Sequence, residues 1–322
     1  MDSTNANIQL ESSRLDSAFI KKFKINPVIK IENNLNRKER SNTSILRKHL
    51  DNQMALYDEG LKLVIQIHEI CKSNHQETKQ GFSLLILSAK MVTLLIGIRK
   101  MLFSGLVDCV KTLKRPFIET IDIFYACLNN QKLSGSFAVK NEMYDNDQFY
   151  WKNFSKGKLK PDISALFRKI SPNEEYITYF FERREGLKKF LSNSIHSSFN
   201  SSFSNYMMCT LEGEISDDYW GKVTTAYPSQ LFSLLEEINL LSQIFNETLS
   251  LKISEELKNI DIKEVNPIYT HYYNKFGLLY SLNAEEFKKE AEAFPAFFKE
   301  MEDYFKAREN TINENDRETP KD

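Results

Sequence analysis

Residues 81–128 read GFSLLILSAKMVTLLIGIRKMLFSGLVDCVKTLKRPFIETIDIFYACL. Two long apolar segments, about Gly81 to Phe103 and Leu106 to Leu128, meet at Ser104-Gly105, a pair typical of a helix end followed by a turn. Each segment has the length and the apolar face of a helix, so we predict two antiparallel helices packed as a hairpin. Pro116 lies inside the second segment, where it removes one helical hydrogen bond, and we expect the helix to kink or restart there.

The rest of the chain is also predicted to be helical. Only 10 glycines and 8 prolines occur in 322 residues, and the alternation typical of strands is nearly absent. We predict an all-α fold, a helical bundle of about seven to nine helices. Besides the hairpin, helices are expected at about 42–73, 147–154, 162–170, 173–195, 228–249, 266–282 and 284–307, with one short extended piece at 133–139.

Composition divides the chain into four expected regions. Residues 1–40 are predicted to form a basic, partly disordered arm, and residues 41–260 a helical core domain. Residues 261–309 are expected to form C-terminal helices packed on the core, and residues 310–322 a disordered polar tail.

Charge is unevenly spread along the chain. The net charge of −1 gives no overall attraction to nucleic acid. Residues 1–50 hold 10 Lys/Arg against 5 Asp/Glu, a net +5, whereas residues 251–322 hold 11 against 16, a net −5. The basic arm is therefore a candidate contact for RNA, DNA or an acidic partner, through Lys21, Lys22, Lys24, Arg37, Lys38 and Arg40.

The most apolar segment, Phe82 to Ile98, is predicted to be a buried core helix rather than a membrane span. It contains Lys90, and a central lysine is costly in lipid. The first 13 residues are polar and lack the apolar region of a signal peptide. The four cysteines form no CxxC pair, as expected of reduced thiols in a cytosolic protein. We therefore expect a cytoplasmic protein with no membrane contact.

One histidine lies among small hydrogen-bonding side chains at helical spacing from charged ones. On a helix that reaches His196, the side chains of Lys189, of Ser192 or Asn193, and of His196 are predicted to share one stripe. His196 is the candidate acid or base, and Lys189 could balance negative charge on a phosphate. Ser192 and Asn193 could orient a ligand. The alternative is a helix-end histidine that interacts with the helix dipole.

A second candidate site is the pair Arg115 and Glu119, one helical turn apart inside the apolar hairpin. The two side chains are predicted to form an ion pair on one face. This pair is either structural or part of a polar binding site within the hairpin.

At these residues the chain resembles an uncharacterised bacterial helical family that is similar to the HEPN superfamily of small helical bundles. The resemblance covers about residues 45–205. It rests on the hairpin 84–128 with a glycine between its helices, on Arg115-x-x-x-Glu119, and on a later helix that ends Leu191-Ser192-x-x-x-His196.

This resemblance implies one of two roles, a ribonuclease or an inactive interaction module. Many HEPN-like proteins are metal-independent ribonucleases of toxin–antitoxin and antiviral systems. Their motif is an arginine, four to six residues and a histidine, usually assembled at a dimer interface. His196 takes the histidine position, but Lys189 stands where the arginine is expected. Lysine keeps the charge and loses the planar fork that grips phosphate at two points. Other HEPN-like domains are inactive and serve as interaction modules.

The leading interpretation is a helical interaction or accessory protein of a prokaryotic defence or stress system, acting by association with itself or with a partner protein. The alternatives are a metal-independent ribonuclease that uses His196, and an RNA- or DNA-binding accessory that uses the basic arm. No cofactor and no metal are predicted, because His68, Cys71 and His75 form a single cluster without the second half of a zinc site.

Overall fold

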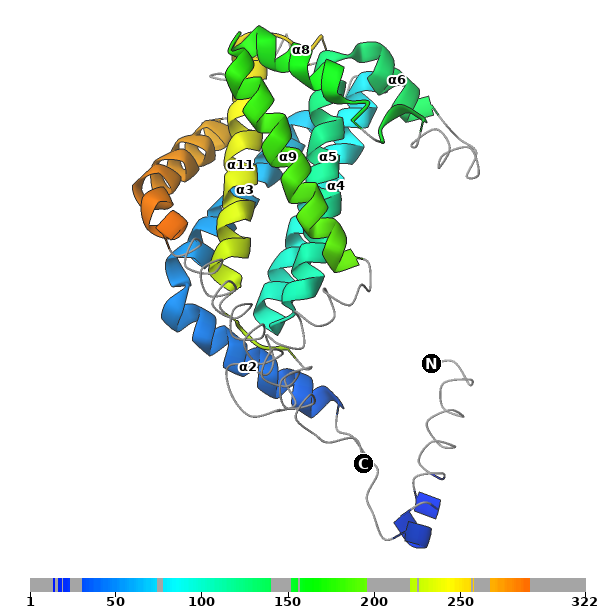
Figure 1. The fold of residues 1–322 in the computed structure, drawn as a ribbon, viewed down its shortest axis with the longest axis vertical. Coiled ribbons are helices and arrows are strands. Elements are labelled where there is room, and N and C mark those ends of the chain that lie inside the picture. Colours follow the sequence, from blue (N-terminus) through cyan, green and yellow to red (C-terminus); the bar gives the residue numbers. More distant parts are fainter. Residues whose placement is uncertain are drawn as a thin grey trace, which may run out of the picture.

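The computed structural model describes residues 14, 17–18, 20–23, 31–73, 78–139, 152–155, 157–195, 221–224, 226–255, 257 and 267–289. Every regular element in this part of the chain is a helix, so the predicted all-α class is confirmed (Figure 1). The labelled helices are α2 (Ile31–His49), α3 (Asp51–Ser73), α4 (Lys79–Ser104), α5 (Val107–Asn129), α6 (Gln131–Val139), α8 (Lys160–Ile170), α9 (Glu174–Ile195) and α11 (Tyr227–Ser250), and a further helix spans 267–289.

The predicted hairpin is present as α4 and α5. Thr78 caps α4 by accepting a hydrogen bond from the Gly81 backbone N–H at 3.0 Å. Gly105 ends α4 in the left-handed region, with φ of 79°, a conformation that suits glycine. α5 continues without a break through Pro116, so the helix restart that was considered at this residue is not observed. The sequence therefore located both helices to within two residues at each end.

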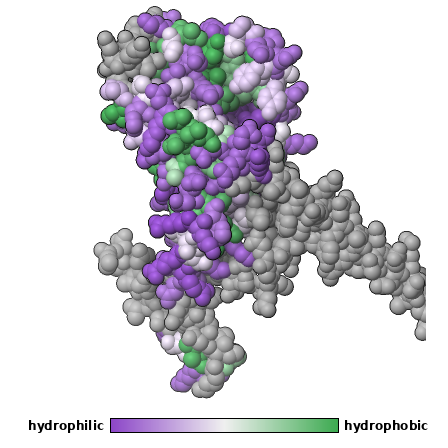
Figure 2. All heavy atoms as spheres, turned by 90° about the vertical axis from the view of Figure 1, so that its left-hand side faces the viewer, coloured by the Kyte–Doolittle hydropathy of each residue, from purple (hydrophilic) through white to green (hydrophobic). Residues whose placement is uncertain are grey.

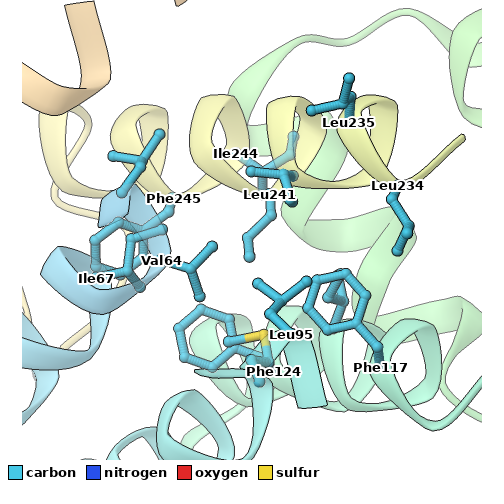
Figure 3. Close-up of a cluster of buried hydrophobic side chains, with 14 of the residues drawn as sticks. Val64, Ile67, Leu95, Phe117, Phe124, Leu234, Leu235, Leu241, Ile244 and Phe245 are labelled. Carbon is cyan, nitrogen blue, oxygen red and sulfur yellow. The ribbon is translucent and has the colours of Figure 1, made fainter. Parts of the chain in front are cut away.

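The core lies where α11 packs on α3 and α5 (Figure 3). Leu234 and Leu241 of α11 point toward Leu95 of α4 and Phe117 of α5 in this close-up, and all four side chains are fully buried. Burying one such side chain contributes about 1.5–3 kcal/mol before entropic costs. These contacts hold the hairpin against α11.

Three local predictions were wrong. Residues 266–282 and 284–307 were expected to form separate helices, but one helix spans 267–289 without a break at residue 283, and residues 290–307 lie outside the described part of the chain. The helix expected over 42–73 is two helices, α2 and α3, because the chain bends at Leu50, and Leu50 is buried. The extended piece expected at 133–139 is instead helix α6. Its start is capped by Asn130, whose side-chain oxygen accepts the Leu133 N–H at 2.9 Å and whose amide donates to Asp162 at 2.8 Å.

A short segment at 221–223 closes the end of the hairpin. The Lys222 N–H donates to the Gly105 carbonyl at 3.0 Å, and the Asn42 amide of α2 donates to the Ser104 carbonyl at 3.1 Å. Asn42 also accepts the Val223 N–H at 3.3 Å. We call residues 42, 104–105 and 221–223 the latch. The latch connects α2 and the segment 221–223, which precedes α11, to the turn between α4 and α5.

The helix at 267–289 packs on the far side of α11 from the hairpin, at the left of Figure 1. On the face seen in Figure 2, hydrophobic residues gather in small patches between hydrophilic ones. This helix contributes exposed apolar side chains, with Leu278 62% and Leu282 72% exposed, while its Tyr269 and Phe276 are buried.

Candidate functional site between α5, α8 and α9

Arg115 links α5 to the last turns of α9. Its Nε lies 3.0 Å from Glu119 Oε1, so the predicted ion pair is present, with both side chains about three-quarters buried. Arg115 Nη1 also donates to the Ser192 hydroxyl, 77 residues further along the chain. Two separately predicted candidates, Arg115 and Ser192, are thus brought into direct contact.

A buried ion network lies beside this contact and joins α5, α9 and α11. Arg184 of α9 pairs with Asp122 of α5 at 3.1 Å and with Glu237 of α11, and all three side chains are at most 5% exposed. Lys188 pairs with Asp122 at 2.6 Å. Arg183 completes the network through Glu236 at 2.8 Å and Glu237 at 2.9 Å.

Within the buried ion network, Arg184 and Glu237 hold each other in their charged forms. Burial would raise the pKa of Glu237, but Arg184 and Arg183 bring that pKa below its ordinary value. Burial likewise opposes the charge on Arg184, yet Asp122 and Glu237 hold its pKa above the ordinary range. Removing Arg184 would break the pairs with both buried carboxylates and leave each of them with a single cation, Lys188 for Asp122 and Arg183 for Glu237.

Lys114 is a further buried cation next to the network. Its ammonium lies 3.4 Å from the side-chain oxygen of Gln230 and its residue is 1% exposed. Burial lowers the pKa of Lys114 to about 7, and Glu237 offsets only part of this shift. Lys114 therefore titrates within the physiological range.

A cavity of about 730 Å³ opens between α5, α8, α9 and residues 154–155, 157 and 159 of the segment before α8. Its wall carries four cationic side chains and three carboxylates, together with apolar side chains from each of these elements. The cations are Arg115, Lys160, Arg184 and Lys188, the carboxylates are Glu119, Asp122 and Glu185, and the apolar members are Ile123, Phe154, Leu159, Ile163 and Phe181. Its volume falls in the range of small-molecule sites.

The remaining candidates of the His196 site are placed only in part. His196 itself lies outside the described residues, and so does the side chain of Asn193, although its backbone belongs to α9. Lys189 is exposed, and it is the neighbouring Lys188 that turns toward α5. One residue of a helix corresponds to about 100° of rotation, which separates the two lysines.

The basic arm is described from residue 31 onward as part of α2, with a few residues before it. Lys21 and Lys22 are exposed, and Lys22 lies over the Phe23 ring at 5.0 Å. Arg37 and Arg40 are exposed on α2, and Lys38 is half-buried. Lys24 lies outside the described residues. Within the described residues, Arg37, Lys38 and Arg40 therefore lie on helix α2.

The outward face of α4 is a second candidate surface. Phe82, Ile86, Ala89, Thr93 and Ile96 follow one another at steps of four, three, four and three, and none of them is buried. α4 carries Lys79, Lys90, Arg99 and Lys100 but no acidic residue. We call the five residues at these steps the α4 seam.

By length and composition α4 could cross a membrane. Its most apolar window of 18 residues has a mean hydropathy of 2.0, and 44% of that window is buried. The buried positions, among them Leu84, Met91 and Leu95, pack against α3 and α5. The buried positions of α4 therefore belong to the hydrophobic core of the described helices.

Sequence reasoning missed Asp122, Arg184, Lys188 and Glu237. A signal was present, because Glu237 lies between Leu234-Leu235 and Ile238 on the apolar side of α11, and Asp122 lies between Ile121 and Ile123. A carboxylate in an apolar stripe needs a buried cation as partner.

Comparison with known proteins finds no matching family model, no matching curated protein and no matching solved structure.

Proposed function

We propose that this chain is a helical association protein whose α4 seam binds an acidic amphipathic helix of a partner protein. The observation that carries the proposal is the α4 seam itself, in which four apolar side chains and Thr93 of the most apolar helix are exposed or half-buried. Phe82 and Ile96 are each 43% exposed near its two ends.

The spacing of the α4 seam fits a helical partner. Alternating steps of three and four residues repeat every 3.5 residues on average, which is the pattern of a coiled-coil seam. Ala89 and Thr93, in the middle of the seam, are small, so a second helix can approach closely there. A flat sheet edge or a loop would not use this periodicity.

The charges around the seam favour an acidic partner. Lys90 and Lys100 are exposed on α4, and Lys79 is exposed at its start. A second copy of the chain would bring the same cations against them, since α4 has no carboxylate. Like charges across an interface oppose pairing, whereas glutamates on a partner helix would attract.

The test uses synthetic helical peptides with leucines at alternating three- and four-residue spacing. One peptide carries glutamate and its counterpart carries lysine at the flanking positions. We expect the full chain to bind the glutamate peptide, with an affinity that falls as salt rises, measured by fluorescence anisotropy. Phe82→Glu combined with Ile96→Glu should abolish the binding.

The matched control is Leu278→Glu combined with Leu282→Glu, which places the same charges on the exposed side of the 267–289 helix. This variant should bind the glutamate peptide like the unchanged chain. Equal binding of the lysine peptide would contradict the proposal. Self-association through the seam, or binding to anionic lipid vesicles that the seam variant loses, would assign the surface to a second copy or to a membrane instead.

The cellular setting proposed for this association is a cytoplasmic prokaryotic defence or stress system. The support for it is the resemblance to the HEPN superfamily over about residues 45–205. In this proposal residues 41–260, which include α11, form the HEPN-like core domain, and residues 261–309 form a C-terminal helical extension.

The second candidate function is a metal-independent ribonuclease, and one contact favours it. Arg115 reaches Ser192, four residues before His196, so an arginine from α5 comes near the end of α9. Its planar guanidinium can grip a phosphate at two points, which Lys189 cannot do. In this proposal Arg115 stabilises the transition-state charge and His196 moves the proton.

The ribonuclease proposal is tested by RNA cleavage in the presence of EDTA. Arg115→Ala and His196→Ala should each abolish cleavage, while Lys189→Ala and the distant Arg168→Ala should leave it intact. Cleavage that survives in the His196 variant would rule this mechanism out.

A further inference from the structure

We propose that the cavity between α5, α8 and α9 binds a small organic anion, with one oxyanion group, phosphate or carboxylate, carried on an apolar body. This site is separate from the α4 seam and does not depend on the association proposed above. Its volume of about 730 Å³ would enclose such a molecule.

The cations of the cavity wall keep hydrogen-bond donors to spare. Arg184 is 4% exposed, and its Nη2 has no hydrogen-bond partner among the described residues. This Nη2 has almost no accessible surface, so Arg184 would act on an incoming oxyanion through its charge rather than through a direct hydrogen bond. Lys188 uses its ammonium on Asp122, which leaves two of its three protons.

Among the cations of this wall, Lys160 makes the weakest interactions with other side chains of the described residues. Its Nζ lies 5.0 Å from the centre of the Phe181 ring, and within the described part of the chain no carboxylate pairs with it. A cation over a ring is held in place while its protons stay free to bind a ligand. Lys160 can therefore pair with an anion without breaking an internal contact.

The carboxylates of the wall do not cancel this attraction. Asp122 already accepts from Arg184 and Lys188, and Glu119 accepts from Arg115. Glu185 is exposed on α9, where water and salt screen its charge. The described wall therefore carries one more cation than carboxylate, and Lys160 is the cation in it that no carboxylate of the described residues pairs with.

The apolar side of the cavity explains why the ligand should carry more than a bare anion. Phe181 is half-buried, with the ammonium of Lys160 over its ring, whereas the other apolar side chains of the wall, Phe154 and Ile163 among them, are buried. An aromatic or aliphatic body would pack on Phe181 while the oxyanion reaches the cations.

The experiment measures binding of four probes to the full chain at low salt, by calorimetry and by the shift in melting temperature. The probes are phenyl phosphate, benzoate, inorganic phosphate and the uncharged benzyl alcohol, each at up to about 5 mM. We expect phenyl phosphate or benzoate to bind more tightly than inorganic phosphate and benzyl alcohol. The stronger of the first two identifies the oxyanion.

Lys160→Met provides the decisive variant, because Lys160 is not part of the buried ion network. It should weaken binding of the better probe by about tenfold, the effect of losing one charge-assisted contact. Lys160→Arg should restore most of the affinity, and Lys132→Met, on the exposed side of α6, should change nothing. No binding by either aromatic anion, equal binding of benzyl alcohol, or full affinity in Lys160→Met would overturn the proposal.

Discussion

At the scale of single residues, Lys114 makes the stability of the fold depend on pH. Its pKa of about 7 in the folded chain lies below the ordinary 10.5, which the unfolded chain retains. Between these values the unfolded state holds a proton that the folded state has lost, so stability should rise as pH rises through this window. Below the window, folding keeps a buried charge and is less favourable.

Lys114→Met tests this dependence, since methionine fills similar space without a charge. Thermal unfolding of the variant should occur at a higher temperature than that of the unchanged chain at about pH 6, and the difference should shrink toward about pH 9. The exposed Lys132→Met serves as control. Parallel curves for the Lys114 variant and the unchanged chain would show that this lysine does not titrate in the fold.

Arg184 is the residue whose loss should cost most. Arg184→Met leaves Asp122 and Glu237 buried without their shared cation, and breaking a buried pair in this way costs about 3–5 kcal/mol. Arg168→Met, which removes an exposed ion pair with Glu174, is the matched control and should have little effect. Urea unfolding measures both, and a similar loss in the two variants would contradict the assignment.

At the scale of elements, the latch requires glycine at residue 221. Gly221 has φ of 106°, and an added Cβ would lie 2.1 Å from the Ser104 carbonyl oxygen. Gly157 also has positive φ, 76°, but an added Cβ there meets nothing within 4 Å. Gly221→Ala should therefore destabilise the fold by more than the roughly 1–3 kcal/mol of backbone strain that Gly157→Ala carries. Chemical denaturation compares them, and equal losses would mean that the latch can shift without cost.

Long helices could be predicted from the sequence because their apolar faces are local patterns. α4, α5, α8, α9 and α11 were each located from spacing, caps and prolines alone. α6 was missed because nine residues carry too little periodicity to outweigh an extended pattern. The bend at Leu50 was missed because no glycine or proline marks it, and it is packing that sets it.

Only those contacts of the candidate site that join residues close together in the sequence could be predicted. The Arg115–Glu119 pair lies within one helical turn, so spacing alone reveals it. The contact of Arg184 with Glu237 spans 53 residues and depends on how α9 lies against α11, which spacing does not contain. The choice between Lys188 and Lys189 depends on the rotation of α9 about its axis, which packing fixes.

At the scale of the whole molecule, one continuous core should make the described helices unfold together. Buried apolar side chains from Leu46 in α2 to Phe287 in the 267–289 helix form a single cluster. We expect the loss of helical circular dichroism and of the near-ultraviolet tyrosine signal to share one midpoint. Two separated transitions would show that part of this core folds independently.

The shared guanidinium of Arg184 also has a consequence for how the sequence can diverge. Because one cation serves carboxylates on two other helices, a substitution at 184 breaks both pairs at once and leaves Asp122 with Lys188 and Glu237 with Arg183 as the remaining cations. In related sequences, substitutions at 122, 184 and 237 should therefore occur together, and three apolar residues are the expected replacement. An alignment of homologous sequences in which the three positions vary independently would show that each charged residue can be replaced without the other two.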